Sequence, residues 1–382
     1  LKKRYIVNNY ILLDGLGSGS YGEVRLCKDR TTDHLYAVKI FSKDMLRKKK
    51  GGSSETYFED VKREIAVMKK LMHPNVLRLF EVLDDPNVNK MYLILEYMKK
   101  GDLINILQRN SPDGADELQG GFTPLSDLEL WNIFRQVSAG IRYLHYQNIV
   151  HGDIKPQNLL IGEDGVVKIA DFGIAKMLHA SGQKLVDSSG TPAFMSPELF
   201  DYNVNFSGQL ADIWAIGATM FMLKFGMPPF IAKNVVTLSQ KIINDPLVFP
   251  ENYELDGKLQ DLLENMLVKD PTKRFTLQQV IMHPWMRMQP APPTLAQSQK
   301  LNQGRSAPAA ANASGLNFAP PSSYEKDESA AMKGPIASIT KDDMFMSIGF
   351  NKAVTQSPAD GTGGPIAEEA ADEEDADQDL MA

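Results

Sequence analysis

Hydrophobic and polar residues alternate in several short stretches within the first hundred residues of the chain. This alternation predicts strands, because successive side chains of a strand point to opposite faces. The predicted strands are residues 10–16, 23–28, 35–41, 77–83 and 91–96. Residues 57–71 instead have the apolar spacing of a helix, and Pro74 follows it. The pattern therefore predicts five strands and one main helix.

The pattern becomes helical in the second third of the chain. One apolar face repeats at spacings of three and four, formed by Leu130, Phe134, Val137, Ile141 and Leu144. Residues 210–225 are apolar on nearly every side, which predicts a buried central helix. Between these helices, residues 159–161 and 166–169 flank Asp164-Gly165, a hairpin signal. The fold class is therefore α+β, with strands first and helices after them.

Composition divides the chain into segments. Residues 1–9 form an N-terminal extension, residues 10–286 carry the dense patterning of a folded domain, and residues 287–335 have the composition of a flexible linker. Residues 336–350 contain an apolar cluster, for which a short docked helix and a disordered segment are both open. Residues 351–382 are expected to be a disordered acidic tail.

Charge and cysteine content exclude some classes of protein. Eight acidic residues lie between Glu368 and Asp379, so without them the formal charge of the chain is +1 rather than −7. Nothing in this balance indicates a nucleic-acid partner, and no apolar run is long enough for a membrane span. Cys27 is the single cysteine, which suits a reducing, cytoplasmic compartment.

A glycine-rich turn follows the first strand. Gly17, Gly19 and Gly22 stand in the spacing G-x-G-x-x-G, followed by Val24. Glycines allow backbone N–H groups to approach phosphate oxygens without a side-chain clash. Dinucleotide-binding folds share this spacing, but there a helix follows, whereas Val24 and Leu26 alternate as in a strand. A plain turn remains the alternative interpretation.

Lys39 is a charged residue within an otherwise apolar strand, after Ala37-Val38. One interpretation is a solvated lysine; the functional one is a contact with the α- and β-phosphates of a nucleotide, which requires a helix carboxylate to hold the lysine. Glu64 is the best candidate for that carboxylate, ahead of Glu55 and Glu59.

Two further motifs carry carboxylates. The first is His151-Gly152-Asp153-Ile154-Lys155-Pro156-Gln157-Asn158, and the second, Asp171-Phe172-Gly173, follows the predicted hairpin. A buried carboxylate is costly unless hydrogen bonds or a metal hold it. Asn158 and Asp171 supply two oxygen ligands of the kind that Mg²⁺ uses together with phosphate and water.

In this order and spacing the motifs resemble those of the eukaryotic protein kinase family over about residues 10–286. The resemblance implies a two-lobed fold, with a five-stranded antiparallel N-lobe (10–96) and a mostly helical C-lobe (99–286). It implies that Asp153 accepts the proton of the substrate hydroxyl and that Lys155 contacts the transferred phosphate, as in serine/threonine kinases. ATP and Mg²⁺ would be the cofactors.

The same resemblance implies roles for other residues. Leu95 corresponds to the residue before the hinge, Glu96 and Met98 lie in the hinge, and Asp102 is placed for the ribose. The residues expected to enclose adenine are Leu16, Val24, Ala37, Leu160 and Ala170. Two expectations are structural: Glu198 pairs with Arg274, and Asp212 tethers the catalytic-loop backbone.

A narrower resemblance is to calcium/calmodulin-dependent protein kinase kinases. It rests on Glu81–Asn87, Tyr143–Gln147, Leu160–Gly165 and Gly190–Met195. It implies a protein substrate that is itself a kinase. Separately, we expect the chain to act as a monomer. Residues 43–54 replace an insert of that family and are expected to be a solvated loop. Beyond Phe350 only Lys352 is basic, which puts calmodulin control in doubt.

Gly152 departs from the family pattern, where an arginine binds phosphate on the activation loop. Without that arginine we expect activity that does not depend on the chain's own loop phosphorylation. The alternatives are an impaired enzyme and a pseudokinase scaffold that acts through the tail; the retained Lys39, Asp153, Asn158 and Asp171 argue against both.

Overall fold

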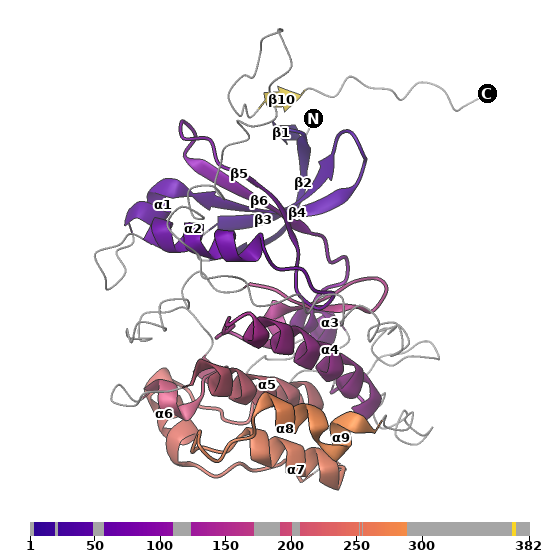
Figure 1. Ribbon diagram of the computed structural model, residues 1–382, viewed down its shortest axis with the longest axis vertical. Helices are drawn as coiled ribbons and strands as arrows, with labels where there is room; N and C mark the ends of the chain where they lie inside the picture. Colours follow the sequence, from indigo (N-terminus) through magenta and orange to yellow (C-terminus); the bar gives the residue numbers. More distant parts are fainter. Residues whose placement is uncertain are drawn as a thin grey trace, which may run out of the picture. The chain divides into compact units, whose positions relative to one another are not determined.

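A computed structural model gives the structure of the protein (Figure 1). It describes residues 4–19, 22–48, 57–109, 124–171, 192–200, 207–251, 253, 255–288 and 369–371. These residues cluster in two compact units. The first contains the chain up to Lys70, Arg78–Tyr97 and Glu369–Ala371, and the second contains Leu71–Leu77 and the chain from Met98 to Met288.

The first unit is built on one antiparallel sheet of strand order β10-β1-β2-β3-β4-β6-β5. All five predicted strands are confirmed, as β2 (Tyr10–Gly19), β3 (Gly22–Asp29), β4 (Leu35–Ser42), β5 (Leu79–Leu83) and β6 (Lys90–Glu96). Two strands were not predicted: β1 (Arg4–Val7) lies in the N-terminal extension, and β10 (Glu369–Ala371) lies within the stretch expected to be a disordered acidic tail.

β1 forms because a two-residue turn folds it back onto β2. Val7 pairs with Tyr10 across Asn8-Asn9, and Asn8 has a φ of 51°, a backbone conformation that asparagine tolerates well. Val7 is 1% exposed and joins the core of the sheet. A strand of four residues is too short to show a period in the sequence, so its prediction was not possible from alternation alone.

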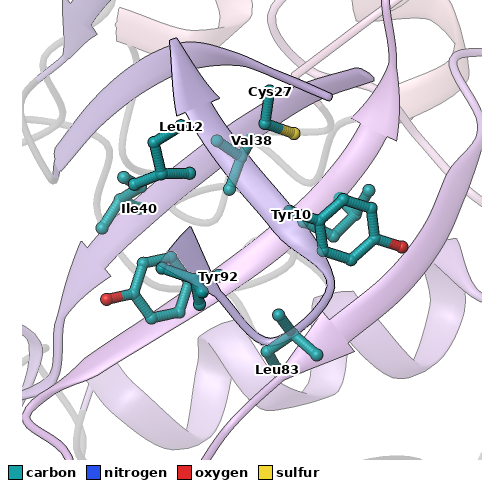
Figure 2. Close-up of a cluster of buried hydrophobic side chains, with 9 residues drawn as sticks. Tyr10, Leu12, Cys27, Val38, Ile40, Leu83 and Tyr92 are labelled. Carbon is teal, nitrogen blue, oxygen red and sulfur yellow. The ribbon is translucent and has the colours of Figure 1, made fainter. Parts of the chain in front are cut away.

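The core of this unit lies on the sheet itself (Figure 2). Its side chains come from six strands, β1 to β6, and Leu12, Cys27, Val38 and Ile40 are all nearly inaccessible to solvent. The hydroxyl of Tyr10 on β2 donates a 2.7 Å hydrogen bond to Glu81 on β5, at the other edge of the sheet. The sheet is therefore curled so that distant strands meet.

Two helices belong to this unit, α1 (Lys43–Lys48) and α2 (Tyr57–Met68). The expectation of a solvated loop over residues 43–54 is wrong for its first six residues. They form α1, in which Lys43 is 2% exposed and Leu46 is fully buried. The sequence pattern hid this helix because its polar residues dominate while a single leucine anchors it. Residues 49–54 lie outside the described residues.

The second unit is mostly helical. Its helices are α3 (Leu103–Arg109), α4 (Asp127–Tyr146), α5 (Gly208–Phe225), α6 (Val235–Asn244), α7 (Gly257–Met266), α8 (Leu277–Met282) and α9 (Pro284–Arg287). Ser126 and Glu129 form a reciprocal capping box that fixes the start of α4. α5 is buried on every side from Ala211 onward, which confirms the predicted central helix. None of the described helices is long and apolar enough to cross a membrane.

A small sheet of order β7-β8-β9 completes this unit. β8 (Leu159–Ile161) and β9 (Val167–Ile169) form the predicted hairpin, and β7 (Gly101–Asp102) adds to its edge. The short 3₁₀ helix η1 (Pro156–Asn158) directly precedes β8, and two more, η3 (Pro192–Phe194) and η4 (Pro197–Phe200), follow later in the chain. The hairpin places the chain segments before β8 and after β9 next to each other.

Candidate active site

The glycine-rich turn joins β2 and β3 as a hairpin. A Cβ atom on Gly22 would lie 1.8 Å from the carbonyl oxygen of Ile40, so only glycine allows β3 to approach β4 there. Gly17 differs, since a Cβ on it would meet nothing within 4 Å. Packing therefore explains Gly22 but not Gly17, and the phosphate contact expected at Gly17 stays a prediction. Gly19 pairs with Gly22 at the end of the hairpin.

Four of the predicted nucleotide residues of the first unit, Val24, Ala37, Lys39 and Leu95, share one face of the sheet. Val24 lies directly opposite Lys39, and Leu95 lies directly opposite Ala37. Residues directly opposite each other in an antiparallel pair point to the same face, and Ala37 and Lys39 are two apart on one strand. The core residues Val38 and Ile40 point to the other face. Leu16 on β2 is 45% exposed, and Glu96 ends β6.

Lys39 is half-buried on that face, with its Nζ atom 5.5 Å from the centre of the Phe41 ring. It is therefore not the fully solvated lysine of the alternative interpretation. Glu64 lies in α2, but its side chain is outside the described side chains. The pairing of Lys39 with Glu64 therefore stays a prediction.

The second unit holds the catalytic-loop residues. The carboxylate of Asp153 lies 3.0 Å from Nζ of Lys155, and its Oδ2 also accepts a 3.1 Å hydrogen bond from Nδ2 of Asn158. Asn158 donates a second bond, of 2.7 Å, to the backbone carbonyl of Asp153. Two predicted site residues, Lys155 and Asn158, therefore converge on the carboxylate of a third, Asp153. The positive charge of Lys155 lies directly beside the negative charge of this carboxylate, which makes their contact a charge-assisted one.

Asp212 on α5 fixes the backbone of this loop. Its Oδ1 accepts a 2.7 Å hydrogen bond from the N–H of Gly152, and its Oδ2 accepts one of 3.0 Å from the N–H of His151. Asp212 is completely buried, so these bonds are not weakened by water. The predicted tether is confirmed.

His151 links the loop to the end of the β8–β9 hairpin. Its ring Nε2 lies 3.1 Å from the carbonyl oxygen of Ala170, and its Nδ1 accepts a 3.1 Å bond from the N–H of Asp153. A carbonyl oxygen can only accept, so the proton of the ring is assigned to Nε2. The side chain is fully buried and holds Asp153 and Ala170 at fixed separation.

Asn158 and Asp171 are brought together by the backbone. The carbonyl oxygen of Asn158 accepts a 2.9 Å hydrogen bond from the N–H of Ala170, the residue before Asp171. Asp171 is exposed and has a φ of 52°, which turns its backbone at this point. The amide nitrogen of Asn158 donates to the backbone carbonyl and to the carboxylate of Asp153, so the amide oxygen is the atom that would face a cation. Two hard oxygen donors at neighbouring positions fit Mg²⁺ bound with phosphates.

The remaining predicted nucleotide residues lie around β7 and β8. Asp102 is directly opposite Leu160 across the two strands, and Met98 is buried. Asp102 also accepts hydrogen bonds from the backbone and side chain of Asn105, so it caps the start of α3. This structural role was not predicted, and the ribose contact stays a prediction.

Glu198 and Arg274 form the predicted buried pair. Two hydrogen bonds of 2.7 and 2.8 Å join the carboxylate to the guanidinium, and both side chains are almost inaccessible. Arg274 also donates to the backbone carbonyl of Leu210 at the start of α5. The pair therefore ties η4 to α5. Phe172, Gly173, Gly190 and Thr191 of the neighbouring motifs lie outside the described residues.

One residue of the site was missed by the sequence analysis. His145 in the last turn of α4 places its Nε2 2.8 Å from Oδ2 of Asp212. It therefore orients the carboxylate that holds the loop. The only signal was a histidine at the end of an otherwise apolar helix face, which is too common to single out.

The amino-acid sequence of this chain is similar to those of known proteins. A family model described as "Protein kinase domain" matches residues 10–286. The chain is 39% identical over 298 residues to a calcium/calmodulin-dependent protein kinase kinase of Caenorhabditis elegans, which covers 73% of this chain and 53% of that protein. It is 39% identical over 280 residues to the serine/threonine-protein kinase GRIK1 of Arabidopsis thaliana, covering 73% and 67%.

A third relative is the serine/threonine-protein kinase ssp1 of Schizosaccharomyces pombe, 40% identical over 292 residues, which are 74% of this chain and 43% of that protein. The match thus spans about half the length of the worm and fission-yeast relatives.

Proposed function

This chain belongs to the protein kinase family, and from that premise we propose that it transfers the γ-phosphate of ATP to serine or threonine hydroxyls of proteins. The observation that carries the proposal is the convergence of Lys155 and Asn158 on the Asp153 carboxylate. An ionised carboxylate held in this way is suited to orient a hydroxyl and to accept its proton.

Each residue of the candidate site has its own role in the proposed reaction. Asp153 positions the substrate hydroxyl and takes its proton as the new bond forms. Lys155 offers positive charge to the transferred phosphate, and Lys39 does so to the α- and β-phosphates. Asn158 and Asp171 would hold Mg²⁺, which when bound neutralises charge on the phosphate oxygens. Positioning and charge neutralisation account for most of the rate in this class of reaction.

The substrate class we propose is another protein kinase, phosphorylated on its activation loop. The support is similarity to a worm protein whose name states that it is a kinase of a kinase. The motif Glu81–Asn87, on which the narrower resemblance rested, has a structural task here: Lys43 forms an ion pair with Asp84 inside it.

We also propose that activity does not depend on phosphorylation of the chain's own activation loop. Gly152 has no side chain to bind a loop phosphate, and its backbone is already held by Asp212. The test is phosphatase treatment of the protein, together with the variants Ser188→Ala and Ser189→Ala. A tenfold or larger drop in rate after dephosphorylation would contradict this part of the proposal.

The central test separates an active kinase from a pseudokinase scaffold. Purified chain is mixed with radiolabelled ATP, Mg²⁺ and a generic basic protein in a single-turnover assay. We expect phosphate transfer by the wild type and a loss of about 10²–10⁴-fold in Asp153→Asn, because the base is removed while its shape is kept. The matched control is Asp164→Asn, an exposed hairpin carboxylate that should leave the rate unchanged. Equal rates in the wild type and Asp153→Asn would refute the assignment.

A second arm of the same assay adds calcium and calmodulin. Because no basic amphipathic segment follows Phe350, we expect the same rate with and without them. A rate that rises several-fold would show that calmodulin acts on this chain through a segment of another kind.

A further inference from the structure

The strand β10 pairs with β1, although the paired residues Arg4 and Ala371 are 367 positions apart in the chain. The register of this antiparallel pair joins Arg4 to Ala371, Tyr5 to Ala370 and Ile6 to Glu369. In Figure 1, β10 lies beside β1 at the edge of the sheet. A segment from the C-terminal tail thus completes the sheet of the first unit.

Without β10, β1 would be an edge strand of that sheet. An edge strand presents unpaired N–H and C=O groups that attract other extended chains. β1 is well anchored on its other side, because it pairs with β2 over three residues and buries Val7 in the core. The open edge is therefore a firm template to which a strand can add.

The charges next to the two strands are opposite in sign. Lys2 and Lys3 precede Arg4, the first residue of β1, and Asp372-Glu373-Glu374-Asp375 follow β10 in the sequence. In an antiparallel pair the start of one strand and the end of the other lie at the same end. In sequence the basic run adjoins Arg4 and the acidic run adjoins Ala371, the partner of Arg4 in the register, and opposite charges facing across strands stabilise pairing.

We propose that β1 is a docking strand for an acidic extended segment, and that its occupant is the acidic tail of the same chain, seated around Glu369–Ala371. Three residue pairs make only a short ladder, which by itself does not distinguish one extended segment from another. The charged residues beside the ladder therefore determine which segment pairs with β1 and in which register. Covalent linkage favours the chain's own tail over the tail of a second copy. A flexible coil as long as the 80 residues between Met288 and Glu369 would have an end-to-end distance of only about 50 Å, which gives the linked tail a high effective concentration near β1.

The first test traps the register with a disulfide in the full-length chain. Tyr5→Cys with Ala370→Cys places two thiols directly opposite each other, at the separation that a disulfide requires. The control is Ile6→Cys with Ala370→Cys, which is one residue out of register and points to the other face. Cys27 does not interfere, because it is completely buried and burial raises the pKa of its thiol to about 12.

Mild oxidation at low salt should close the Tyr5→Cys/Ala370→Cys pair at least tenfold faster than the control pair, within a monomer. Equal rates in the two pairs, or no closure in either, would overturn the proposed register. Closure only between molecules, seen as a covalent dimer, would overturn the assignment of the occupant to the chain's own tail.

The second test addresses the charges. Lys2→Glu with Lys3→Glu should slow the disulfide closure at low salt severalfold, and so should Asp372→Lys with Glu373→Lys. Combining all four substitutions exchanges the two charged runs and should restore the wild-type rate. In 1 M salt the closure rates with and without these charge substitutions should become similar, because the Debye length is then only about 3 Å. Closure rates insensitive to both substitutions and salt would refute the role of charge.

Discussion

The backbone N–H of Gly152 donates a 2.7 Å hydrogen bond to Oδ1 of Asp212, while the φ of Gly152 is 70°. The same carboxylate accepts a bond from the N–H of His151 through its other oxygen. A residue on the central helix thus sets the conformation of the catalytic loop, sixty residues earlier in the chain. The left-handed conformation of Gly152 is part of that arrangement.

Asp212→Asn should lower kcat/KM by about 5–150-fold. The amide keeps the shape of the carboxylate but replaces one acceptor with an NH₂ group that faces an N–H donor, and an unsatisfied buried polar group costs about 1–3 kcal/mol. The comparison is with Asp261→Asn, an exposed carboxylate on α7 that also accepts from a histidine, His283. Steady-state kinetics that show equal effects of the two substitutions would argue against the tether.

Gly152→Ala should destabilise the protein by about 1–2 kcal/mol, because a Cβ is unfavourable in the left-handed region. Gly257→Ala provides the control, since Gly257 begins α7 and a Cβ there would meet nothing within 4 Å. That change should be neutral or slightly stabilising. Urea unfolding followed by tryptophan fluorescence measures both, and a neutral Gly152→Ala would contradict the described backbone.

Lys43→Met should cost about 3–5 kcal/mol of stability, since it leaves Asp84 without its partner in a nearly dry environment. Lys43 Nζ lies 2.5 Å from Oδ1 of Asp84, with side-chain exposures of 3% and 10%. Replacing both residues, as Lys43→Met with Asp84→Leu, should recover much of this loss.

The control for this pair is Lys28→Met, which removes an exposed ion pair with Asp33. Exposed pairs contribute about 0–1 kcal/mol, so the change should be small. If Lys28→Met and Lys43→Met shift the denaturation midpoint equally, burial does not govern the Lys43–Asp84 pair.

Stability should fall in mild acid because of His73. Burial, with the positive charges of Arg142 and Lys168, lowers the pKa of His73 from 6.5 to about 4. The unfolded chain therefore binds this proton more readily than the folded protein does. The stabilisation that comes from a neutral His73 is complete above pH 6.5, and it is lost as the pH falls from 6.5 towards 4. Its full size is on the order of 2–3 kcal/mol.

The geometry of His73 explains why the proton is unwelcome. Its Nδ1 accepts a 3.0 Å hydrogen bond from the N–H of Asn75, and protonation at Nδ1 would replace that bond with a clash of two donors. In His73→Gln the loss of stability between pH 7 and 5 should therefore be smaller than in the wild type. His34→Gln, at an exposed histidine, should leave the pH profile as it is.

The sequence by itself determined those features that depend on local order. Period-two alternation located all five long strands, and the apolar run at 210–225 located α5, because burial on one face or on every face leaves a mark within ten to twenty residues. The motif around Asp153 identified the site for a similar reason: its three converging side chains lie within six residues, so their spacing is fixed by the backbone.

Only the tertiary structure decided which distant groups meet. Neither the position of His145 beside Asp212 nor the bond from Tyr10 to Glu81 follows from any local pattern, because each depends on which surfaces pack. α1 escaped prediction because one buried leucine and one buried ion pair hold it. β1 and β10 escaped because each is stable only when paired, and pairing between the two ends of a chain has no period to reveal it.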